Sequence, residues 1–430
     1  MIPRRGRALV AARCFRAGET ILAEQPNVVV PMADDVGNAL VCSRCLAFLG
    51  DTDMHLGLAA GRISIAAARA EIALGDSSQC FECGALYCGS ECRVADVARG
   101  HRLLCPGGGG SSRGEADADG RAPDSKSMVA ARMDDTRLNA AAAWERFRRH
   151  AREEAELPEL ELAATLLAAV LISETGMCTS ETLEACVPLL LVQEPVATVL
   201  SRDAAGAEAA ASTLREVETS CNLCRAAMIL TCGAAGVAKA SVRRRCTMTG
   251  TNSFGNLVGL AFLNQVAVTV SSPAEDVTKH LMVAASPAGG AEPAAMAALQ
   301  QLIPLAQEAK AMRVGATEEE EVTIEDLQEP ASLFPPLDAT GLSYFVCLMN
   351  HSCAPNAVVS YKSEDSDARL ALPEETRAPA IARIVALHDI AEGEEIVHPY
   401  VDRDEPLVQR HEGLAIYGIQ CSCAKCRSGR

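Results

Sequence analysis

The carboxyl-terminal end of the sequence holds three cysteines within six residues, Cys421, Cys423 and Cys426. Three crowded thiols cannot all point into an apolar core, and they are one ligand short of a tetrahedral zinc site. Cys353 ends the polar turn Asn350-His351-Ser352-Cys353 and is the natural fourth ligand. A zinc ion held by these four residues would tie the end of the chain to the loop that carries Asn350 and His351.

A second set of metal-ligating residues occurs as close pairs near the amino terminus. The pairs are Cys42 with Cys45, Cys80 with Cys83, Cys88 with Cys92, and His101 with Cys105. A two-residue spacing lets both thiolates face one ion, and residues four apart share one face of a helix. Eight ligands complete two tetrahedral sites. The pairs can combine sequentially or in an interleaved order, and spacing alone does not choose between them.

Composition limits the class of protein. The chain has 430 residues, of which 49% are hydrophobic and only 3% aromatic, so we expect a globular protein with a core of small aliphatic side chains. The net charge of −17 argues against direct binding to nucleic acid and favours a basic protein partner. The sequence shows no secretory signal and no apolar run long enough to span a membrane, which predicts nuclear or cytoplasmic placement. In that setting most of the 19 cysteines are expected to be metal ligands rather than disulfides.

Local patterns suggest how the elements are ordered along the chain. Strand patterns occur at 8–11, 20–22 and 28–30, and again at 357–361, 381–387 and 396–400. Helical patterns follow 137, with helices expected over 161–173 and 207–227. Residues 250–270 look β-rich, and 271–335 look like an acidic insertion that is partly disordered, with one helix near 294–312.

The order of the eight amino-terminal ligands, with Tyr87 before Cys88, resembles the MYND zinc finger. The resemblance implies interleaved sites: Cys42, Cys45, Cys88 and Cys92 on one zinc ion, and Cys80, Cys83, His101 and Cys105 on the other. The gap of 34 residues between Cys45 and Cys80 is longer than usual and implies a surface insertion. Ala98 replaces a tryptophan common in these fingers, which weakens the case for proline-rich peptide binding.

The whole chain resembles the SET-and-MYND family of protein-lysine methyltransferases. The matching segments are Arg5-Gly6-Arg7-Ala8-Leu9, Asn252-Ser253-Phe254, Asn350-His351-Ser352-Cys353, Gly393 to Tyr400, and Tyr417-x3-Cys421-x-Cys423-x2-Cys426. The resemblance implies an α+β fold with small antiparallel sheets. The expected units are an N-terminal SET segment (1–41), a MYND finger (42–105), a linker (106–136), a helical insert (137–249), a SET core (250–405, with the insertion 271–335) and a post-SET zinc segment (406–430).

The same resemblance assigns roles to individual residues. Tyr400 and Tyr417 would be the catalytic tyrosines that line a lysine channel. The S-adenosylmethionine contacts would be Arg5, Arg7, Asn252, Asn350 and His351. Two zinc ions are expected in the finger, and a third in the post-SET site formed by Cys353 with the last three cysteines. Because the chain stops four residues after Cys426, we also expect it to lack the helical-repeat domain of many relatives.

The chemistry of methyl transfer suits these residue types. A sulfonium is already an activated leaving group, so the protein must align the groups and exclude water rather than supply a nucleophile. The lysine amine must be neutral, which a dry channel favours. Ala8 and Ile419 stand where the family commonly has a glycine and an aromatic residue. They motivate the alternative of a catalytically decayed scaffold that binds protein partners through its finger.

Overall fold

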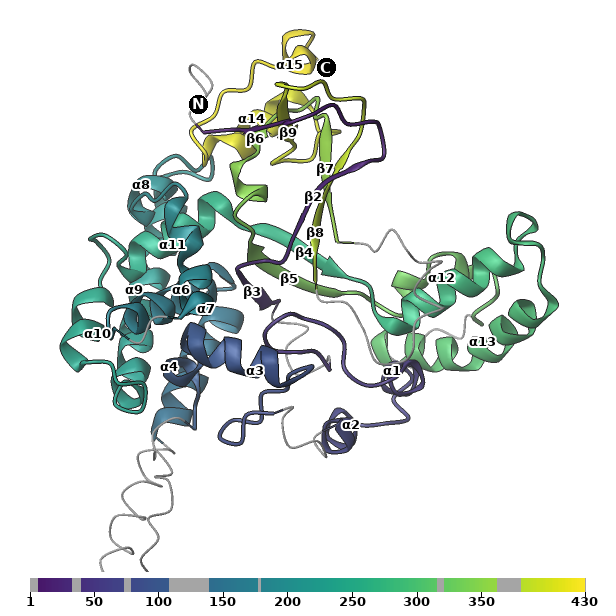
Figure 1. Ribbon diagram of the computed structural model, residues 1–430, viewed down its shortest axis with the longest axis horizontal. Helices are drawn as coiled ribbons and strands as arrows, with labels where there is room; N and C mark the ends of the chain where they lie inside the picture. Colours follow the sequence, from purple (N-terminus) through teal and green to yellow (C-terminus); the bar gives the residue numbers. More distant parts are fainter. Residues whose placement is uncertain are drawn as a thin grey trace, which may run out of the picture.

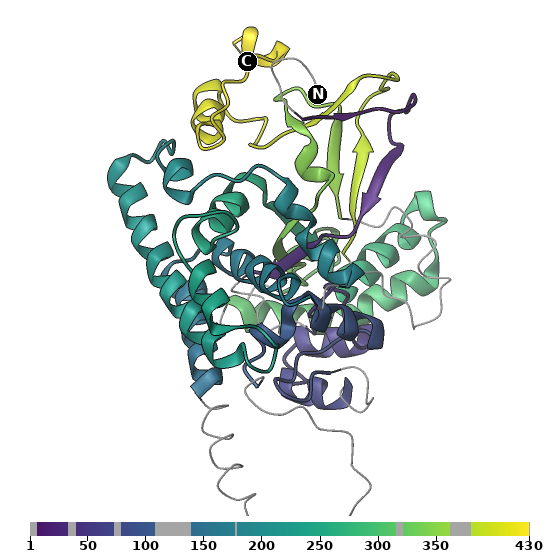
Figure 2. The same ribbon diagram turned by 60° about the vertical axis from the view of Figure 1, so that its left-hand side comes forward.

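The computed structural model describes residues 7–32, 40–72, 79–107, 139–176, 179–314, 321–361 and 380–429. Three small sheets form the centre of the molecule, helices gather on one side, and a pair of helices projects on the other (Figure 1). Helices α14 (Leu407–Ala415) and α15 (Ala424–Arg427) lie at the same end as strands β6 and β9 (Figure 2). Among the described residues, no helix is long and apolar enough to cross a bilayer.

Each sheet has three strands, in the orders β1-β9-β6, β2-β8-β7 and β3-β5-β4. The strands are β1 (Leu9–Val10), β2 (Thr20–Glu24), β3 (Val28–Pro31), β4 (Val266–Val270), β5 (Leu337–Leu342), β6 (Asn350–His351), β7 (Ala357–Ser360), β8 (Ala382–Ala386) and β9 (Glu395–His398). All neighbours pair antiparallel except β6 and β9, which are parallel. The α+β class with small sheets is therefore confirmed, with one parallel pair that the sequence did not predict.

Every sheet joins the amino-terminal segment to distant parts of the chain. Strand β1 pairs with β9, β2 with β8, and β3 with β5. Side chains along β8 alternate between the core and the outside. Ala382, Ile384 and Ala386 are buried, and the residues between them are partly exposed. The first strands therefore complete a core whose other strands follow residue 266.

The large helical region packs around one central helix, α6. The other elements are helical residues 139–149, η3 (His150–Glu154), α7 (Ser180–Cys186), η4 (Val187–Leu190), α8 (Val196–Leu200), α9 (Ala207–Thr231), α10 (Lys239–Arg245) and α11 (Phe254–Asn264). Helix α6 (Glu159–Ser173) is buried on nearly all sides because α7, α11 and β3 pack against it. An apolar sequence on every face of a helix is typical of such a central position.

The prediction of a β-rich stretch over 250–270 is wrong for its first half. Helix α11 occupies most of it, and only β4 is a strand. Ser253 begins the helix, since its side chain accepts a hydrogen bond from the backbone amide of Asn256. The run after the cap is apolar on all faces, and periodicity does not separate a buried helix from a buried strand in such a run.

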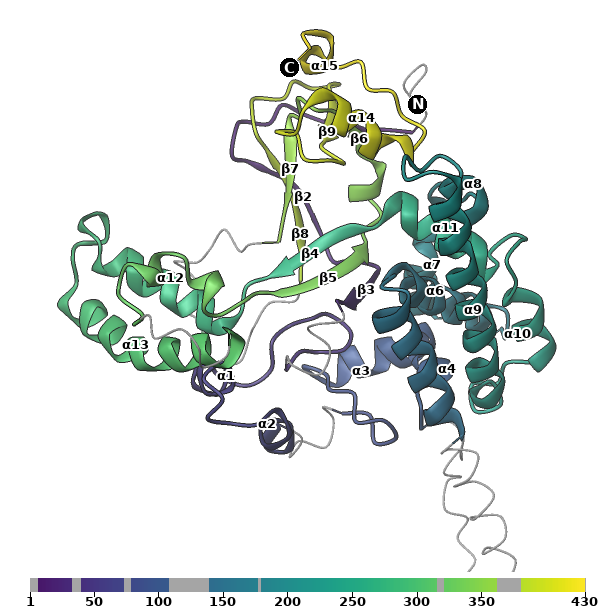
Figure 3. The same ribbon diagram turned by 180° about the vertical axis from the view of Figure 1, so that it is seen from behind.

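The expectation of partial disorder over 271–335 is also wrong for most of the segment. It forms α12 (Pro273–Ala285), η5 (Pro287–Gly289), α13 (Pro293–Val314), η6 (Asp326–Gln328) and η7 (Pro330–Ser332), and residues 315–320 lie outside the described part. Leu299, Leu302 and Phe334 are buried in a cluster of their own. Helices α12 and α13 form the projecting arm, which Figure 3 shows from behind. The acidic run at 318–321 falls almost wholly outside the described residues.

The finger contains α1 (Thr52–Ala59), α2 (Ile65–Ile72), α3 (Ser90–Asp96), η2 (Val97–His101) and α4 (Arg102–Leu104). Helix α1 belongs to the insertion after Cys45 and packs against α12 and α13. Arg62, which follows α1, forms an ion pair of 2.6 Å with Glu308 of α13. The two insertions thus meet in space, although more than two hundred residues separate them in sequence. Nearly all of the expected linker (106–136) lies outside the described residues.

Candidate metal centres and active site

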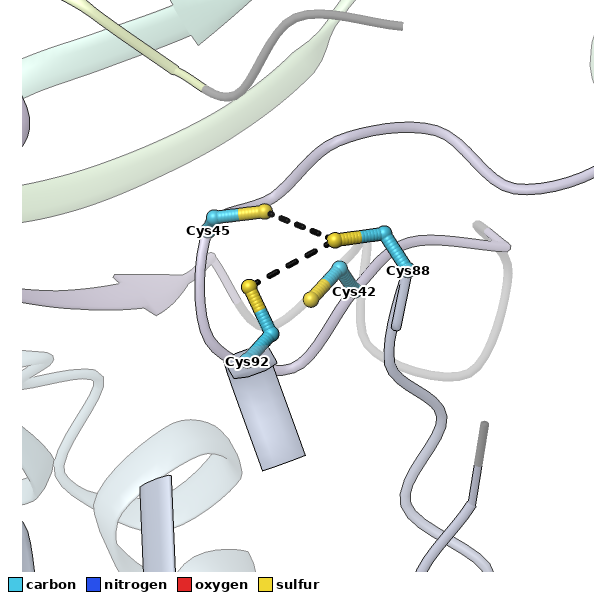
Figure 4. Close-up of side chains that lie close together, drawn as sticks. All are labelled: Cys42, Cys45, Cys88 and Cys92. Atoms are coloured by element: carbon cyan, nitrogen blue, oxygen red, sulfur yellow. Dashed lines mark hydrogen bonds between the residues drawn. The ribbon is translucent and has the colours of Figure 1, made fainter. Parts of the chain in front are cut away.

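Four cysteines from two segments of the finger converge on one point. The sulfur of Cys88 lies 3.7 Å from that of Cys45 and 3.4 Å from that of Cys92, and Cys42 completes the group (Figure 4). Zinc bonds of about 2.3 Å place tetrahedral sulfur ligands about 3.8 Å apart, so the spacing fits a zinc ion. Hydrogen bonds from the thiols of Cys45 and Cys92 lower the pKa of Cys42 to about 2. The cluster therefore favours a thiolate, which is the form that binds metal.

The second cluster of the finger contains Cys80, Cys83, His101 and Cys105. The sulfurs of Cys80 and Cys105 are 3.9 Å apart, and Nε2 of His101 lies 3.6 Å from the sulfur of Cys83. Nδ1 of His101 faces the Asp96 carboxylate at 3.2 Å, and Tyr87 donates a hydrogen bond to the same carboxylate. Asp96 therefore holds the imidazole with Nε2 toward the sulfurs, as carboxylates do behind zinc-bound histidines. The ligands group in the interleaved order.

The third cluster joins Cys353 to the three carboxyl-terminal cysteines, Cys421, Cys423 and Cys426. The sulfur of Cys353 lies 3.5 Å from that of Cys426 and 4.0 Å from that of Cys421. Arg410 of α14 is 1% exposed, and one of its guanidinium nitrogens lies 3.9 Å from the sulfur of Cys426. Four thiolates carry excess negative charge beside a divalent ion, so a buried guanidinium at this distance stabilises the site.

Asn350 and His351 form strand β6, beside the strand that leads to Tyr400. In the parallel pair, Asn350 lies opposite Val397 and His351 opposite His398. The Asn350 amide donates to the Glu395 carboxylate at 2.7 Å and to the backbone oxygen of Arg7 at 3.1 Å. Asn350 therefore joins β9 to the amino-terminal segment. The Arg7 side chain donates to the backbone oxygen of Leu190, while Arg5 lies outside the described residues.

His351 connects the metal cluster to the tyrosines. Its Nδ1 accepts the backbone N–H of Tyr400 at 3.0 Å, and its Nε2 lies 3.2 Å from the sulfur of Cys353. Because Nδ1 accepts, the imidazole proton sits on Nε2 and is donated to the sulfur. Burial and the nearby Arg410 lower the pKa of His351 to about 4, so the ring is neutral at physiological pH.

Tyr400 and Tyr417 come together although they lie on different segments. Their ring centroids are 5.0 Å apart at 54°, and His398 lies 5.1 Å from the Tyr400 ring. The Tyr400 hydroxyl donates a hydrogen bond of 2.6 Å to the backbone oxygen of Met349. Burial raises the pKa of both phenols, so both remain protonated at neutral pH. The pair forms an aromatic wall beside Asn350 and His351.

Asn252 stands in a strained turn immediately before α11. Its φ is +52°, a left-handed conformation that asparagine tolerates better than most residues. Its side-chain oxygen is buried and has no hydrogen-bond partner in the described part of the chain. An unpaired buried acceptor is costly unless a ligand satisfies it, so this residue fits a donor group such as a cofactor amine.

Comparison with known proteins identifies a SET domain in this chain. A profile of the SET domain family matches residues 196–401. The chain is 29% identical to the histone-lysine N-methyltransferase ATXR2 of Arabidopsis thaliana over 184 residues, which are 40% of this chain and 28% of the relative. It is 34% identical to the protein-lysine N-trimethyltransferase SMYD5 of Mus musculus over 110 residues, 24% of this chain and 26% of the relative. It is 33% identical to the N-lysine methyltransferase SMYD2 of Homo sapiens over 82 residues, 19% and 15% of the two chains.

The cysteine clusters at 42–105 lie outside the SET match and are consistent with a MYND finger. The chain carries a SET domain, and the SMYD5 and SMYD2 relatives support its resemblance to the SET-and-MYND family. The aligned segments span 28% or less of the length of the three relatives. The SET match begins at α8 and runs past Tyr400, so it contains β4 to β9 and the Asn350-His351 strand.

Several residues of this site were not predicted from the sequence. Glu395 holds Asn350, Met349 accepts from Tyr400, and Arg410 supports the third cluster. Glu395 lies within a segment that carried the family resemblance, which was the available signal. Nothing near Arg410 in the sequence indicated its contact with Cys426. The pair that follows it, His411-Glu412, lacks the second histidine of a zinc protease motif.

Proposed function

We propose that this protein is an S-adenosylmethionine-dependent protein-lysine methyltransferase. The observation that carries the proposal is the placement of the stacked Tyr400 and Tyr417 rings beside the Asn350-His351 strand. The three relatives are all named lysine methyltransferases, which supports the reaction class.

S-adenosylmethionine, when bound, supplies a methyl group on a sulfonium leaving group. Asn350, His351, Arg7 and the unpaired oxygen of Asn252 are the residues that would hold it. Tyr400 donates its proton to Met349, which leaves the lone pairs of its oxygen to accept an N–H of the substrate amine. The aromatic wall excludes water and favours the neutral amine that attacks the methyl group.

The three cysteine clusters suit structural zinc, two ions in the finger and one in the post-SET segment. All four protein ligands are present at each cluster, which is typical of closed structural sites rather than catalytic ones. The third ion would anchor the segment after α14 and so keep Tyr417 against Tyr400. The proposed substrate is a protein with a basic, lysine-containing segment, because the net charge of −17 attracts such partners.

Calorimetric titration of the zinc-replete protein with S-adenosylmethionine tests the cofactor site. Asn350→Ala should abolish binding, while Asn222→Ala on the exposed side of α9 should bind like the wild type. Transfer of labelled methyl groups to recombinant core histones then tests the reaction. Absence of binding in a folded, zinc-loaded wild-type protein would contradict the proposal.

One surface feature favours a second activity, protein binding by the finger. Phe81 is 71% exposed between the ligands Cys80 and Cys83, and Val94 on α3 is 58% exposed. Large apolar side chains exposed on a rigid finger suit a partner protein. If the protein were a scaffold with a decayed SET core, Phe81→Ser would abolish partner binding and the wild type would transfer no methyl groups. An enzyme would keep turnover on a free peptide when Phe81 is replaced.

A further inference from the structure

The helical region contacts the carboxyl-terminal segment directly beside one of the two tyrosines. Arg202 lies just after α8, and Gly418 follows Tyr417 (Figure 1). A Cβ atom on Gly418 would lie 3.7 Å from Nη1 of Arg202 and 3.8 Å from its Cδ and Cζ atoms. The Arg202 side chain therefore covers the side of Gly418 on which any other residue would carry its side chain.

Gly418 forms the turn that ends α14 and fixes the backbone of its neighbour. Its φ is +66°, the left-handed conformation in which helices commonly end at a glycine. The N–H of Gly418 donates to the backbone oxygen of Ala415 at 2.8 Å. The N–H of Tyr417 donates to the backbone oxygen of Leu414 at 3.2 Å. Tyr417 is therefore one residue away from the group that Arg202 covers.

A two-pronged ion pair holds the Arg202 side chain in one orientation. Its Nη2 lies 2.5 Å from Oε2 of Glu194, and its Nη1 lies 3.2 Å from Oε1 of the same carboxylate. The two side chains are 32% and 29% exposed, so the pair is partly shielded from water. Two parallel hydrogen bonds to a carboxylate fix the plane of a guanidinium group as well as its position.

Helix α11 provides the support for this ion pair. A side chain at Gly259 of α11 would clash with the backbone oxygen of Glu194, so the chain can run this close to the helix only because the residue is glycine. The side-chain amide of Asn264, at the end of α11, donates to the backbone oxygen of Val192 at 3.2 Å. The connection between η4 and α8 is therefore attached to a buried helix on both sides of its middle residue.

The same connection also contacts the proposed cofactor residues. The backbone oxygen of Leu190 accepts a hydrogen bond from the Arg7 side chain, and the backbone oxygen of Arg7 accepts one of 3.1 Å from Asn350. The helical region thus meets the candidate site at two points. One point is the amino-terminal segment at Arg7, and the other is the turn after Tyr417.

We propose that Arg202 is a positioning residue that holds Tyr417 against Tyr400 by covering Gly418. The inference rests on the proposed methyltransferase function. The third cluster would hold the chain at Cys421, on one side of Tyr417, and the Arg202 contact holds it at Gly418 on the same segment. A partly exposed ion pair contributes little to stability, whereas a small displacement of a group that aligns the substrate can slow a reaction strongly. Arg202 therefore acts on the geometry of the lysine channel without touching the substrate.

The first test observes the Tyr417 ring itself, by fluorine NMR of the zinc-replete full chain that contains 3-fluorotyrosine. The chain has five tyrosines, and the Tyr417 signal is the one that is absent from Tyr417→Phe. In Arg202→Ala this signal should shift toward its position in the unfolded protein, because the ring loses its fixed contact with Tyr400. The signal of Tyr87, which is buried in the finger, should not move. An unchanged Tyr417 signal in Arg202→Ala would overturn the inference.

Two further variants separate positioning from a general loss of structure. Arg202→Lys keeps the charge but lacks the planar group, so its Tyr417 signal should lie between those of the wild type and Arg202→Ala. The matched control is Arg152→Ala, because Arg152 forms a two-pronged pair with Glu161 in the same helical region. Its Tyr417 signal should equal that of the wild type. An equal shift in Arg152→Ala and Arg202→Ala would show that any damage to the helices moves the ring, and would overturn the inference.

The second test compares turnover with cofactor binding. Arg202→Ala should lower kcat for methyl transfer to recombinant core histones by about tenfold. Its affinity for S-adenosylmethionine, measured by calorimetry, should stay at the wild-type value because the Arg7 contact with Leu190 is retained. Equal losses of affinity and turnover would show a general disruption and overturn the inference. A Tyr417 signal that depends on Arg202, in a wild-type protein that transfers no methyl groups, would contradict the proposed function and leave the positioning contact standing.

Discussion

The Nε2 atom of His351 lies 3.2 Å from the sulfur of Cys353, and the other nitrogen of the same ring accepts the backbone N–H of Tyr400. A single imidazole therefore bridges the post-SET cluster and the residue proposed to orient the substrate. The orientation of Tyr400 depends on the cluster through two hydrogen bonds. Occupancy of this metal site and shape of the active site are expected to change together.

Loss of the third metal site should disable cofactor binding as well as the carboxyl-terminal fold. Cys426→Ser should lower the zinc content by about one ion per chain, because a closed structural site needs all four ligands. It should also weaken S-adenosylmethionine binding, since Cys353, which accepts the hydrogen bond of His351, is no longer held in place by the metal site. Metal analysis and calorimetry check both results. The matched control is Cys14→Ser, because Cys14 is an exposed cysteine outside the clusters. Unchanged affinity for S-adenosylmethionine in Cys426→Ser protein that has lost its zinc would contradict the coupling.

Removal of one hydroxyl separates chemistry from binding. Tyr400→Phe loses the 2.6 Å hydrogen bond to Met349, which should lower the free energy of unfolding by only about 1 kcal/mol. Turnover should fall by about a hundredfold because the amine loses its orienting group, while affinity for S-adenosylmethionine stays near the wild-type value. Single-turnover transfer and calorimetry measure the two effects. Tyr344→Phe, outside the tyrosine pair, should leave both unchanged, and full turnover in Tyr400→Phe would refute the assigned role.

Local spacing was enough to identify the close pairs that the structure gathers into clusters able to hold a metal ion, whereas the contacts that arrange the candidate active site are long-range. Close cysteine pairs indicate metal sites because both ligands must reach one ion. The parallel pairing of β6 with β9 joins segments whose separation in sequence carries no periodic signal. Sequence reasoning could therefore supply Asn350, His351 and the tyrosines only through family resemblance, and it missed Glu395 and Arg410.

Composition misled the prediction of the insertion. Its alanine, proline and glycine content suggested disorder, but Leu299, Leu302 and Ala306 recur at helical spacing and are buried together. These three side chains share their cluster with Leu56 of α1, which belongs to the other insertion. A buried face whose partner lies so far away in sequence cannot be recognised from its own segment.

Acid should destabilise the fold through His398. Burial, together with the nearby His351, lowers its pKa to about 4, below the ordinary value of about 6.5. The unfolded state therefore binds more protons between these values, so the stabilisation is complete above pH 6.5 and is lost as pH falls toward 4. Between pH 7.5 and pH 5 the free energy of unfolding should fall by about 2 kcal/mol more in the wild type than in His398→Asn. Urea unfolding at both pH values tests this, and the variant corrects for acid effects elsewhere, including those on the metal sites. Equal losses in the two proteins would show that His398 titrates normally.

The arm formed by α12 and α13 should depend on its own small core. Leu299 is fully buried there, so Leu299→Ala should cost about 2–5 kcal/mol of local stability. Met312→Ala on the same helix is the control, because its side chain is 67% exposed and its removal should cost less than about 0.5 kcal/mol. Hydrogen exchange should show faster opening of α12, α13 and α1 together in Leu299→Ala, since Leu56 of α1 shares the cluster. Faster exchange confined to α13 would mean that the two insertions are stable independently. The arm would then not stabilise the finger.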